Sequence, residues 1–388
     1  MSHIAGETST GSKTRRALYG RYANDDAAPG LLRRSAGCTI VDVRGREYVD
    51  FVMGLGAVSL GYGHPAVVAA VCAAAEAGGV GPVAPELEET VAADLAALFP
   101  AHPRWRFLKT GAEAVAAAVR LARVTTGRER VLTCGYHGWL DWSQDAGAAG
   151  VPRALGTLAS PVPFNDIDAS RVAIRTTAEQ LAAVVLEPVI HTEPTVEWLK
   201  TVREETRRVG AQLIFDEVKT VCRVAPGGAV ERWGGEPDLV VVGKAIANGM
   251  PLAAVGGTDE AMAAIGKTWI SSTLATEFVS LAAAHATIKT VRSDNVPTTL
   301  ARAGAALHEG MTRLAQRQPA VIRQVTGIPV MCAFEWVDED AGARVALECA
   351  RRGLIFKRTP WNFVSLAHTP AVVADALAVL DEALSAAS

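Results

Sequence analysis

The sequence lacks the features that identify membrane, secreted and nucleic-acid-binding proteins. No apolar run is long enough to cross a membrane, and the first residues contain no hydrophobic secretion signal. The formal net charge is only -3, from 38 basic and 41 acidic residues, so no basic excess attracts nucleic acid or an anionic membrane surface. We therefore expect a cytoplasmic protein that binds neither.

Cysteine is also scarce. The six cysteines are scattered, with no CxxC pair and no nearby histidine cluster. This spacing indicates reduced, mostly buried thiols rather than a disulfide framework, and it predicts no metal site.

What the sequence does contain is a long, apolar chain that can bury a large core. With 388 residues and 49% hydrophobic content, two domains are expected. Strand and helix patterns alternate through the middle third, which predicts an α/β fold with a mostly parallel sheet. From about residue 294 the pattern changes to a smaller α+β domain, which the N-terminal segment joins. The predicted boundaries are 1–62, 63–293 and 294–388.

Individual elements follow from local patterns. Alternating apolar and polar residues around the turn at Arg44 and Gly45 predict a β-hairpin over residues 38–51. Pro65 is expected to start a helix. Further predicted helices cover 86–98, about 111–125, 197–208, about 274–292 and 300–316, and predicted strands cover 106–109, 130–134, 181–187, 251–257, 327–336, 354–357 and 363–366.

The most informative stretch runs from Leu213 to Met250. Two short apolar runs, 213–215 and 239–242, end in Asp216 and in Lys244, and such runs fit strands that are buried on both faces. Ligands of open α/β sheets gather at the carboxyl ends of such strands. A lysine there can form a Schiff base with a carbonyl cofactor, while an acid keeps a ring nitrogen protonated. An ordinary ion pair, or two solvated loop residues, is the alternative.

Two further stretches can bind a flat, phosphorylated ligand. Gly111 stands where a strand meets a helix, so the free N–H groups there can bind an anion, although Gly111 can equally be a simple turn residue. Tyr136 follows the strand 130–134, where it can stack on a flat ring or belong to the core. The glycine-rich segment 54–65 lacks the strand–turn–helix context of a dinucleotide loop.

The chain resembles a known family when its motifs are taken together. The motifs on which this resemblance rests are, in sequence order, VDVRGREYVDF, LGYGHP, TGAEAVAAAVRLARVTTGRERV, GYHGW, LEPV, LIFDEV, GKAIANGMPLAAVGG, STLATE and SLAHT. They resemble the class III aminotransferases of the fold-type I pyridoxal-phosphate (PLP) enzymes, and most of all the glutamate-1-semialdehyde aminomutase branch. The resemblance covers roughly residues 38 to 383. It implies a homodimer that binds PLP in shared active sites.

The resemblance also implies a role for individual residues. Lys244 would form the Schiff base with PLP and move the proton, and Asp216 would pair with the ring nitrogen. Val218 and Tyr136 would cover the two ring faces, while Gly111 and Ala112 would hold the phosphate through backbone N–H groups. Three more residues match family positions: Thr273 would reach the phosphate of the partner subunit, and Glu187 and His137 would lie near the cofactor or contact it through another residue.

The implied reaction is a ping-pong transamination. An amino-acid donor, expected to be L-glutamate, would pass its amino group to the enzyme, which would then load it onto a carbonyl acceptor. The alternative is a PLP-dependent isomerase, either the aminomutase itself or an amine epimerase. A non-catalytic relative is disfavoured by the intact set of Lys244, Asp216, Tyr136 and Thr273.

Several departures from the family pattern argue against the aminomutase reaction. No arginine stands near Ser365, where an ω-aminotransferase binds the donor carboxylate, and the loop 359–362 lacks the aminomutase glutamate. Leu55 replaces a family tryptophan. Arg21 lies near the place of a substrate-binding arginine, although it can equally be a surface residue.

The loop before SLAHT suggests a substrate class. Lys357, Arg358 and Trp361 form a basic and aromatic set that suits a hydroxylated carbonyl, such as an oxidised sugar, aminocyclitol or aminoglycoside intermediate; a solvated basic loop is the alternative. The high Ala, Gly and Arg content is associated with GC-rich bacteria, in which such enzymes often serve secondary metabolism. Antibiotic biosynthesis is the expected context.

Overall fold

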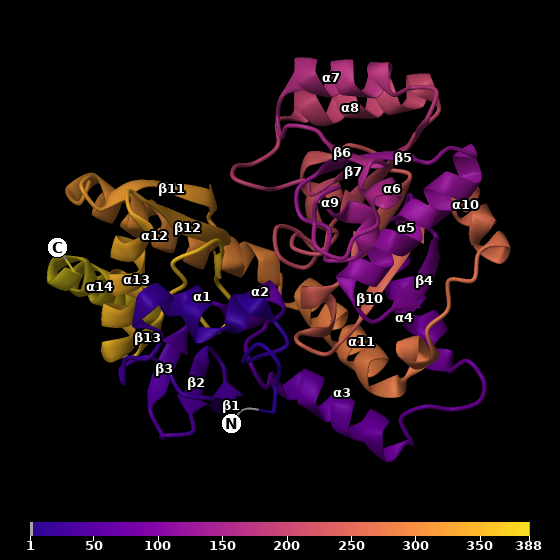
Figure 1. Ribbon diagram of the computed structural model, residues 1–388. Helices are drawn as coiled ribbons and strands as arrows, with labels where there is room; N and C mark the ends of the chain where they lie inside the picture. Colours follow the sequence, from indigo (N-terminus) through magenta and orange to yellow (C-terminus); the bar gives the residue numbers. More distant parts are fainter. Residues whose placement is uncertain (1–2, 388) are drawn as a thin grey trace. The chain divides into compact units, whose positions relative to one another are not determined.

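The computed structural model describes residues 3–387, and the chain divides into two compact units (Figure 1). The small unit combines residues 1–64 with residues 298–388, and the large unit comprises residues 65–297. Nowhere in residues 3–387 does a helix combine the length and the apolar character that crossing a membrane requires. Within the same span, His, Cys, Asp and Glu side chains form no cluster that can hold a metal ion.

The large unit is built on one seven-stranded sheet with the order β4-β10-β9-β8-β7-β5-β6. Only β10 runs antiparallel to its neighbours, β9 and β4. The sheet strands are β4 (Arg104–Leu108), β5 (Arg130–Cys134), β6 (Ala159–Pro161), β7 (Leu181–Leu186), β8 (Gln212–Asp216), β9 (Leu239–Val242) and β10 (Ala253–Gly257). The helices are α3 (Pro65–Glu76), α4 (Glu86–Leu98), α5 (Gly111–Thr126), α6 (Arg153–Gly156), α7 (Ile167–Thr176), α8 (Val196–Val209), α9 (Gly228–Trp233), α10 (Asp259–Met262) and α11 (Phe278–Ser293).

Helices cover the central strands of this sheet, which explains their continuous apolar runs. Every residue of β7 and of β9 is buried. The helix α5 packs its alanine-rich face on the strands β7 to β10 and forms one core with them. Strands buried on both faces need no alternation of polar and apolar residues. The mostly parallel α/β fold expected from the sequence is thereby confirmed.

The small unit contains two smaller sheets, with the orders β1-β2-β3-β13 and β11-β12-β14. Its strands are β1 (Leu32–Ala36), β2 (Thr39–Asp42), β3 (Glu47–Asp50), β11 (Ile322–Ile328), β12 (Met331–Trp336), β13 (Leu354–Ile355) and β14 (Asn362–Phe363). Its helices are α1 (Arg15–Tyr19), α2 (Met53–Gly56), α13 (Glu339–Arg351) and α14 (Pro370–Ala387), and α12 (Val296–Arg317) begins at the boundary with the large unit.

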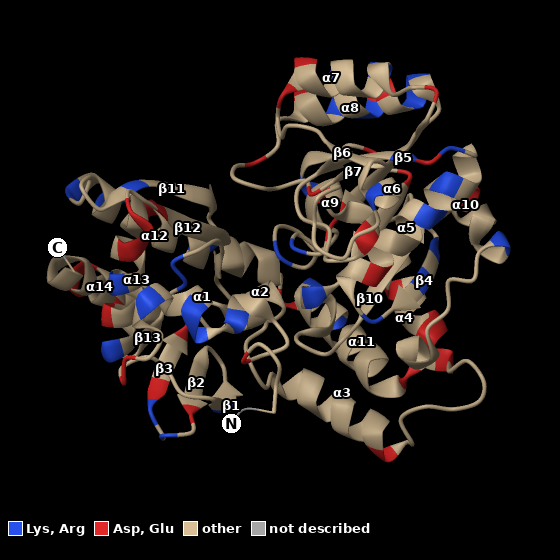
Figure 2. Ribbon diagram, viewed as in Figure 1, with Lys and Arg blue, Asp and Glu red and all other residues tan. Residues whose placement is uncertain are grey.

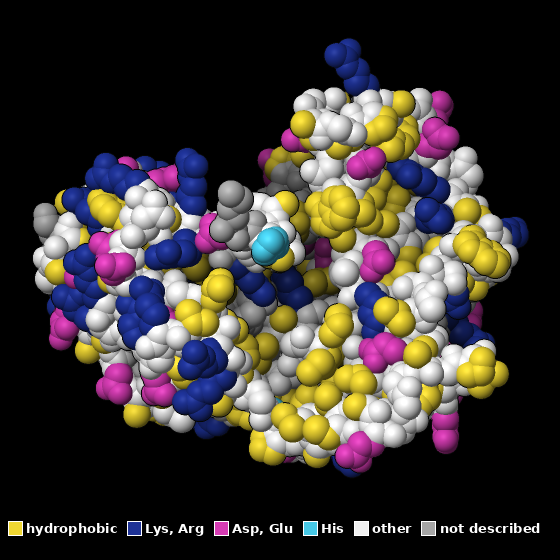
Figure 3. Space-filling view, turned by 60° about the horizontal axis from the view of Figure 1, so that its bottom comes forward, with side chains coloured by type: hydrophobic (Ala, Val, Ile, Leu, Met, Phe, Trp, Pro, Cys, Tyr) yellow, Lys and Arg dark blue, Asp and Glu magenta, His cyan; other side chains and the backbone are white. Residues whose placement is uncertain are grey.

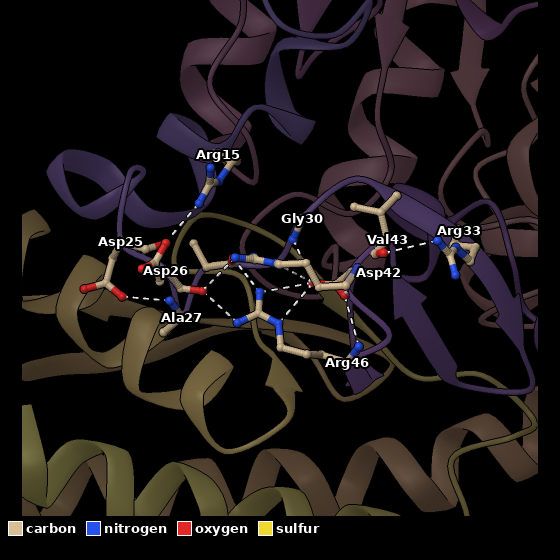
Figure 4. Close-up of polar contacts among 11 residues, drawn as sticks. Arg15, Asp25, Asp26, Ala27, Gly30, Arg33, Asp42, Val43 and Arg46 are labelled. Atoms are coloured by element: carbon tan, nitrogen blue, oxygen red, sulfur yellow. Dashed lines mark hydrogen bonds and ion pairs between the residues drawn. The ribbon is translucent and has the colours of Figure 1, made fainter.

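A buried carboxylate fastens the N-terminal segment to the predicted hairpin (Figure 4). Asp42 accepts hydrogen bonds from the N–H of Gly30 at 3.0 Å and from the Arg46 guanidinium at 3.0 Å. Arg46 in turn donates to the carbonyl groups of Asp26 and Ala28. Burial alone would raise the pKa of Asp42, but these hydrogen bonds outweigh it and hold the pKa well below its ordinary value.

Most predicted elements are confirmed, and one is wrong. The hairpin 38–51 is present as β2 and β3, and Pro65 does start α3. The single strand predicted over 327–336 is instead two strands, β11 and β12, which pair as a hairpin with Ile328 opposite Met331. Pro329 interrupts the run because it has no N–H to give to a ladder. The helices α7 and α13 were not predicted from the sequence.

Candidate active site

The polar residues of the candidate site follow the carboxyl ends of four adjacent parallel strands, β5, β7, β8 and β9. Strand pairing sets Cys134 beside Leu186 and Leu186 beside Phe215. On the other side of β8, Asp216 lies opposite Val241. The residues directly after these pairs therefore gather at one edge of the sheet, as the spacing predicts.

Asp216 is buried and is held by two neighbours. His137 Nδ1 lies 2.9 Å from Asp216 Oδ2, and the N–H of Val218 donates to Oδ1 at 3.2 Å. A carboxylate only accepts hydrogen bonds, so Nδ1 of His137 carries the proton. The ring of Trp142 stacks on the His137 ring at a centroid distance of 6.3 Å. Asp216 is thus fixed in orientation before any ligand arrives.

Lys244 follows β9 and begins a short 3₁₀ helix, Lys244–Ala247. Its backbone has a φ of 48°, a left-handed conformation that is uncommon for a residue with a side chain and that is found at functional sites. Loss of hydration is the largest influence on its amine and, with the nearby ammonium of Lys219, lowers the pKa of Lys244 to about 8. Near pH 7 about a tenth of this lysine is therefore an uncharged nucleophile, whereas an ordinary lysine is almost completely charged there.

Glu187 connects three of the strand ends. It follows β7, and its Oε2 accepts a hydrogen bond at 3.0 Å from the N–H of Tyr136, which follows β5. Its other oxygen forms an ion pair at 2.8 Å with Lys219, in the segment after β8. Both side chains of the pair are largely buried, with 12% of Lys219 and 7% of Glu187 exposed.

The start of α5 presents two backbone N–H groups. Thr110 and Glu113 form a capping box: the side chain of Thr110 accepts a hydrogen bond from the N–H of Glu113, and the side chain of Glu113 accepts one from the N–H of Thr110. The N–H groups of Gly111 and Ala112 have no acceptor within residues 3–387. Gly138, in the segment after β5, approaches so closely that an added Cβ would lie 2.4 Å from Ala112 Cβ. This first turn is positioned to bind an anion.

The large unit thus brings together Gly111, Ala112, Tyr136, His137, Glu187, Asp216, Val218 and Lys244. A Cβ added at Gly111 would lie 3.1 Å from Val218 Cγ2, which places Val218 beside the helix start. Tyr136 is 70% exposed. Thr273 belongs to the same unit but is exposed, at the start of the 3₁₀ helix Thr273–Thr276.

The four predicted substrate residues belong to the small unit. Lys357 is buried rather than solvated: its ammonium donates to the carbonyl of Pro360 at 2.6 Å, and loss of hydration lowers the pKa of Lys357 to about 8. The guanidinium of Arg358 donates to the carbonyl of Ala17. Trp361 packs against Gly327. Arg21 is exposed and forms an ion pair with Asp340 at 2.7 Å.

Three residues that shape the site were not predicted from the sequence: Lys219, Trp142 and Gly138. Lys219 stands three positions after Asp216, and that proximity was the one available signal. Trp142 and Gly138 act through contacts with His137 and Ala112 that no local pattern encodes. Two hollows in the large unit, of about 400 and 330 Å³, are lined by other residues, among them Trp105 and Trp269. The site is therefore recognised by its chemistry, not by the volume of a cavity.

Comparison with known proteins places this fold among the PLP-dependent enzymes of fold-type I. The FumI protein of Sphingopyxis sp. MTA144, solved in its PLP internal aldimine form, is 27% identical with a TM-score of 0.92, covering 99% of this chain and 93% of that one. An omega-transaminase from Sphaerobacter thermophilus is 26% identical with a TM-score of 0.86, covering 97% and 94% of the two chains.

The sequence comparisons define the family. The glutamate-1-semialdehyde 2,1-aminomutase of Roseiflexus castenholzii is 32% identical over 92% of this chain and 90% of that protein. The family model of aminotransferase class III matches residues 22–387. The chain belongs to the class III aminotransferase family, and its cofactor is PLP.

The residues of the site fit this cofactor. The free N–H groups of Gly111 and Ala112 suit a phosphate, and a buried carboxylate, Asp216, suits a protonated ring nitrogen. An amine with a lowered pKa suits an aldehyde. The donor set thus contains one group for each reactive part of PLP.

Proposed function

We propose that this protein is a ping-pong aminotransferase that takes an amino group from an amino-acid donor, L-glutamate, and delivers it to a carbonyl acceptor. Class III aminotransferase or aminomutase chemistry is what the family performs. The observation that carries the proposal is the pairing of Lys244, with its pKa near 8, and the buried Asp216 at neighbouring strand ends.

The cofactor-binding roles that we propose follow from the contacts. Gly111 and Ala112 donate their N–H groups to the phosphate, and Asp216 holds a proton at the ring nitrogen. His137 keeps Asp216 in place. Val218 and Tyr136 cover the ring, and Glu187 fixes the backbone of Tyr136. When bound, PLP supplies a carbonyl that captures the donor amine and a ring that accepts electrons.

Lys244 then moves the proton. With PLP and the donor bound, its uncharged amine would take the proton from Cα of the donor as general base and would then hold that proton as general acid. A general base works best with a pKa near the operating pH, and a value of about 8 meets this condition. The buried carboxylate of Asp216 would stabilise a protonated ring nitrogen.

Replacement of Lys244 tests the proposal. We expect Lys244→Ala to bind PLP without a covalent bond, so it loses the visible absorbance of the attached cofactor and at least about a thousandfold in turnover. The measurement is absorbance together with an assay of amino donors and carbonyl acceptors. Lys200→Ala, at an exposed lysine of α8, is the control. Turnover retained in Lys244→Ala would refute the assignment.

The second candidate is an isomerase, either a glutamate-1-semialdehyde aminomutase or an amine epimerase. The identity to the Roseiflexus aminomutase favours it. The two reactions differ in stoichiometry, because a transaminase consumes one donor for each product and an isomerase consumes none. Turnover of a single substrate without an added donor or acceptor would therefore favour the isomerase.

For the acceptor we propose a hydroxylated carbonyl compound, such as a sugar, aminocyclitol or aminoglycoside intermediate, made in antibiotic biosynthesis. Arg21, Lys357, Arg358 and Trp361 are the proposed substrate residues. Among them, Arg21 is the one with a strongly exposed cation, whereas the ammonium of Lys357 is buried against Pro360. A screen that compares oxidised sugars with simple 2-oxo acids tests this class.

We also propose a cytoplasmic homodimer in which Thr273 serves the active site of the partner subunit. All six cysteines are unpaired, which suits a reducing compartment. Thr273 is exposed, and the helix α3 presents a nearly uncharged surface (Figure 2). An exposed apolar helix face commonly marks an interface.

A further inference from the structure

Lys219 is a second lysine at the same edge of the sheet, three residues after Asp216. Its side chain is only 12% exposed, and its ammonium lies 2.8 Å from Glu187 Oε1. A buried lysine requires a partner, and Glu187 supplies one. The role proposed above for Glu187, fixing the backbone of Tyr136, needs only its other oxygen.

The chain segments that lead to Lys219 and to Lys244 lie side by side: the N–H of Glu217 donates to the carbonyl of Val241 at 2.8 Å, and a Cβ added at Gly243 would lie 3.6 Å from Val218 Cγ2. The charged groups near Lys244 come from three strand ends. Asp216 follows β8, Lys219 and Arg223 stand in the segment after it, and Glu187 follows β7. Lys219 and Arg223 disfavour a proton on Lys244, whereas Glu187 and Asp216 favour one. Of the four charged groups, Lys219 has the largest influence. His137 also lies at this edge, and its hydrogen bond goes to Asp216.

We propose that Lys219, held by Glu187, is a positioning residue that favours the uncharged form of Lys244, the form that attacks the cofactor carbonyl. This inference rests on the proposed role of Lys244. A cation fixed near a nucleophilic amine disfavours a second positive charge, and the low dielectric of a buried site strengthens the effect. Glu187 keeps Lys219 charged and in place.

The test measures how the reactivity of Lys244 depends on pH. Apo-protein is mixed briefly with PLP at a series of pH values, and borohydride then fixes the cofactor on each lysine that it has reached. Mass spectrometry gives the modified fraction of Lys244 and, in the same sample, of the exposed Lys200, which reports the reagent's own pH dependence. Only an uncharged amine reacts, so the midpoint of the corrected profile reports the protonation of Lys244.

We expect Lys219→Gln to raise this midpoint by about half a pH unit or more, because a neighbouring positive charge has been removed. Lys219→Arg keeps the charge and should keep the midpoint of the unchanged protein. Glu187→Gln should lower the midpoint, since it removes a negative charge while Lys219 remains. A general loss of packing in the site would move the midpoint in the same direction in Lys219→Gln and in Glu187→Gln. Opposite shifts of the midpoint therefore indicate an effect of charge.

The outcomes distinguish a failure of the role of Lys219 from a failure of the proposed function. If Lys219→Gln and the unchanged protein share one midpoint, Lys219 has no role in tuning Lys244 and the inference is overturned. If Lys219→Gln does not fold, the neutral variant Lys219→Met decides: a midpoint above that of the unchanged protein supports the inference, and an equal or lower one overturns it. If Lys244 of the unchanged protein is not modified at all, the proposed function itself fails.

Discussion

At the scale of single residues, the site depends on which side chains hold the two catalytic groups. The motif GYHGW indicated that His137 lies near the cofactor, and the structure gives it a contact with Asp216 at 2.9 Å. Trp142, which covers the His137 ring, could not be predicted, because residues five apart on an irregular segment have no fixed relation. Asp216 could be identified from the sequence, whereas the packing of Trp142 on His137, which holds Asp216, depends on the tertiary structure.

We expect His137→Phe to weaken PLP binding by about tenfold to a hundredfold. The change leaves Asp216 buried with the N–H of Val218 as its remaining hydrogen bond, and a hydrogen bond to a charged group contributes about 1.5–3 kcal/mol. Titration of the apo-protein with PLP measures the affinity.

The matched control is His285→Phe. His285 forms a similar pair with Asp94 at 2.6 Å, on the helices α11 and α4, and it is partly exposed. This variant should bind PLP as the unchanged protein does. An equal loss of affinity in both variants would mean that His137 contributes only to general stability.

At the scale of elements, the phosphate site depends on the contact between the start of α5 and the segment after β5. The strand–helix boundary was predictable from Thr110, Gly111 and Glu113, because a capping box is a local pattern. The approach of Gly138 to Ala112 was not, because it joins two segments that only the sheet brings together. The start of α5 thus depends on the local capping box, whereas the contact of Gly138 with Ala112 depends on the tertiary structure.

Gly138→Ala tests this contact. The new Cβ would lie 2.4 Å from Ala112 Cβ, and the φ of 99° is strained for any residue with a side chain, so the segment and the helix start must separate. We expect the affinity for PLP to fall about tenfold or more, which corresponds to about 1.4 kcal/mol. Gly150→Ala has a similar φ of 82° but no atom within 4 Å, so it controls for backbone strain alone. Equal affinities of the two variants for PLP would contradict the proposed phosphate site.

At the scale of the whole molecule, the chain carries apolar surface that its own fold leaves uncovered. On the large unit, Val68 of α3, Val83 of the following loop, Trp269 and Leu274 are 45%, 77%, 89% and 55% exposed. Figure 3 shows hydrophobic side chains gathered on the side of the large unit that carries α3. A second copy of the chain is the occupant that the proposed role of Thr273 requires.

We expect the protein to sediment as a dimer and Val83→Glu to weaken this dimer by at least about tenfold. A buried valine contributes about 1.5–3 kcal/mol, and an unpaired charge in its place adds a further cost. Val172→Glu, at a valine of α7 that is 64% exposed, is the control and should leave the dimer intact. A protein that sediments as a monomer at micromolar concentration would exclude the shared active site.

The sequence by itself determined the mostly parallel sheet, the strand ends that carry Asp216 and Lys244, and the family, because these depend on local apolar runs and on motifs in a fixed order. Only the tertiary structure decided that Lys219 pairs with Glu187, that Gly138 meets Ala112 and that Lys357 is buried. These contacts join segments far apart in the chain or depend on how a loop packs. The contacts of Lys219 and Gly138 follow from strand order and register, which a single sequence does not specify. The burial of Lys357 follows from the packing of its own loop.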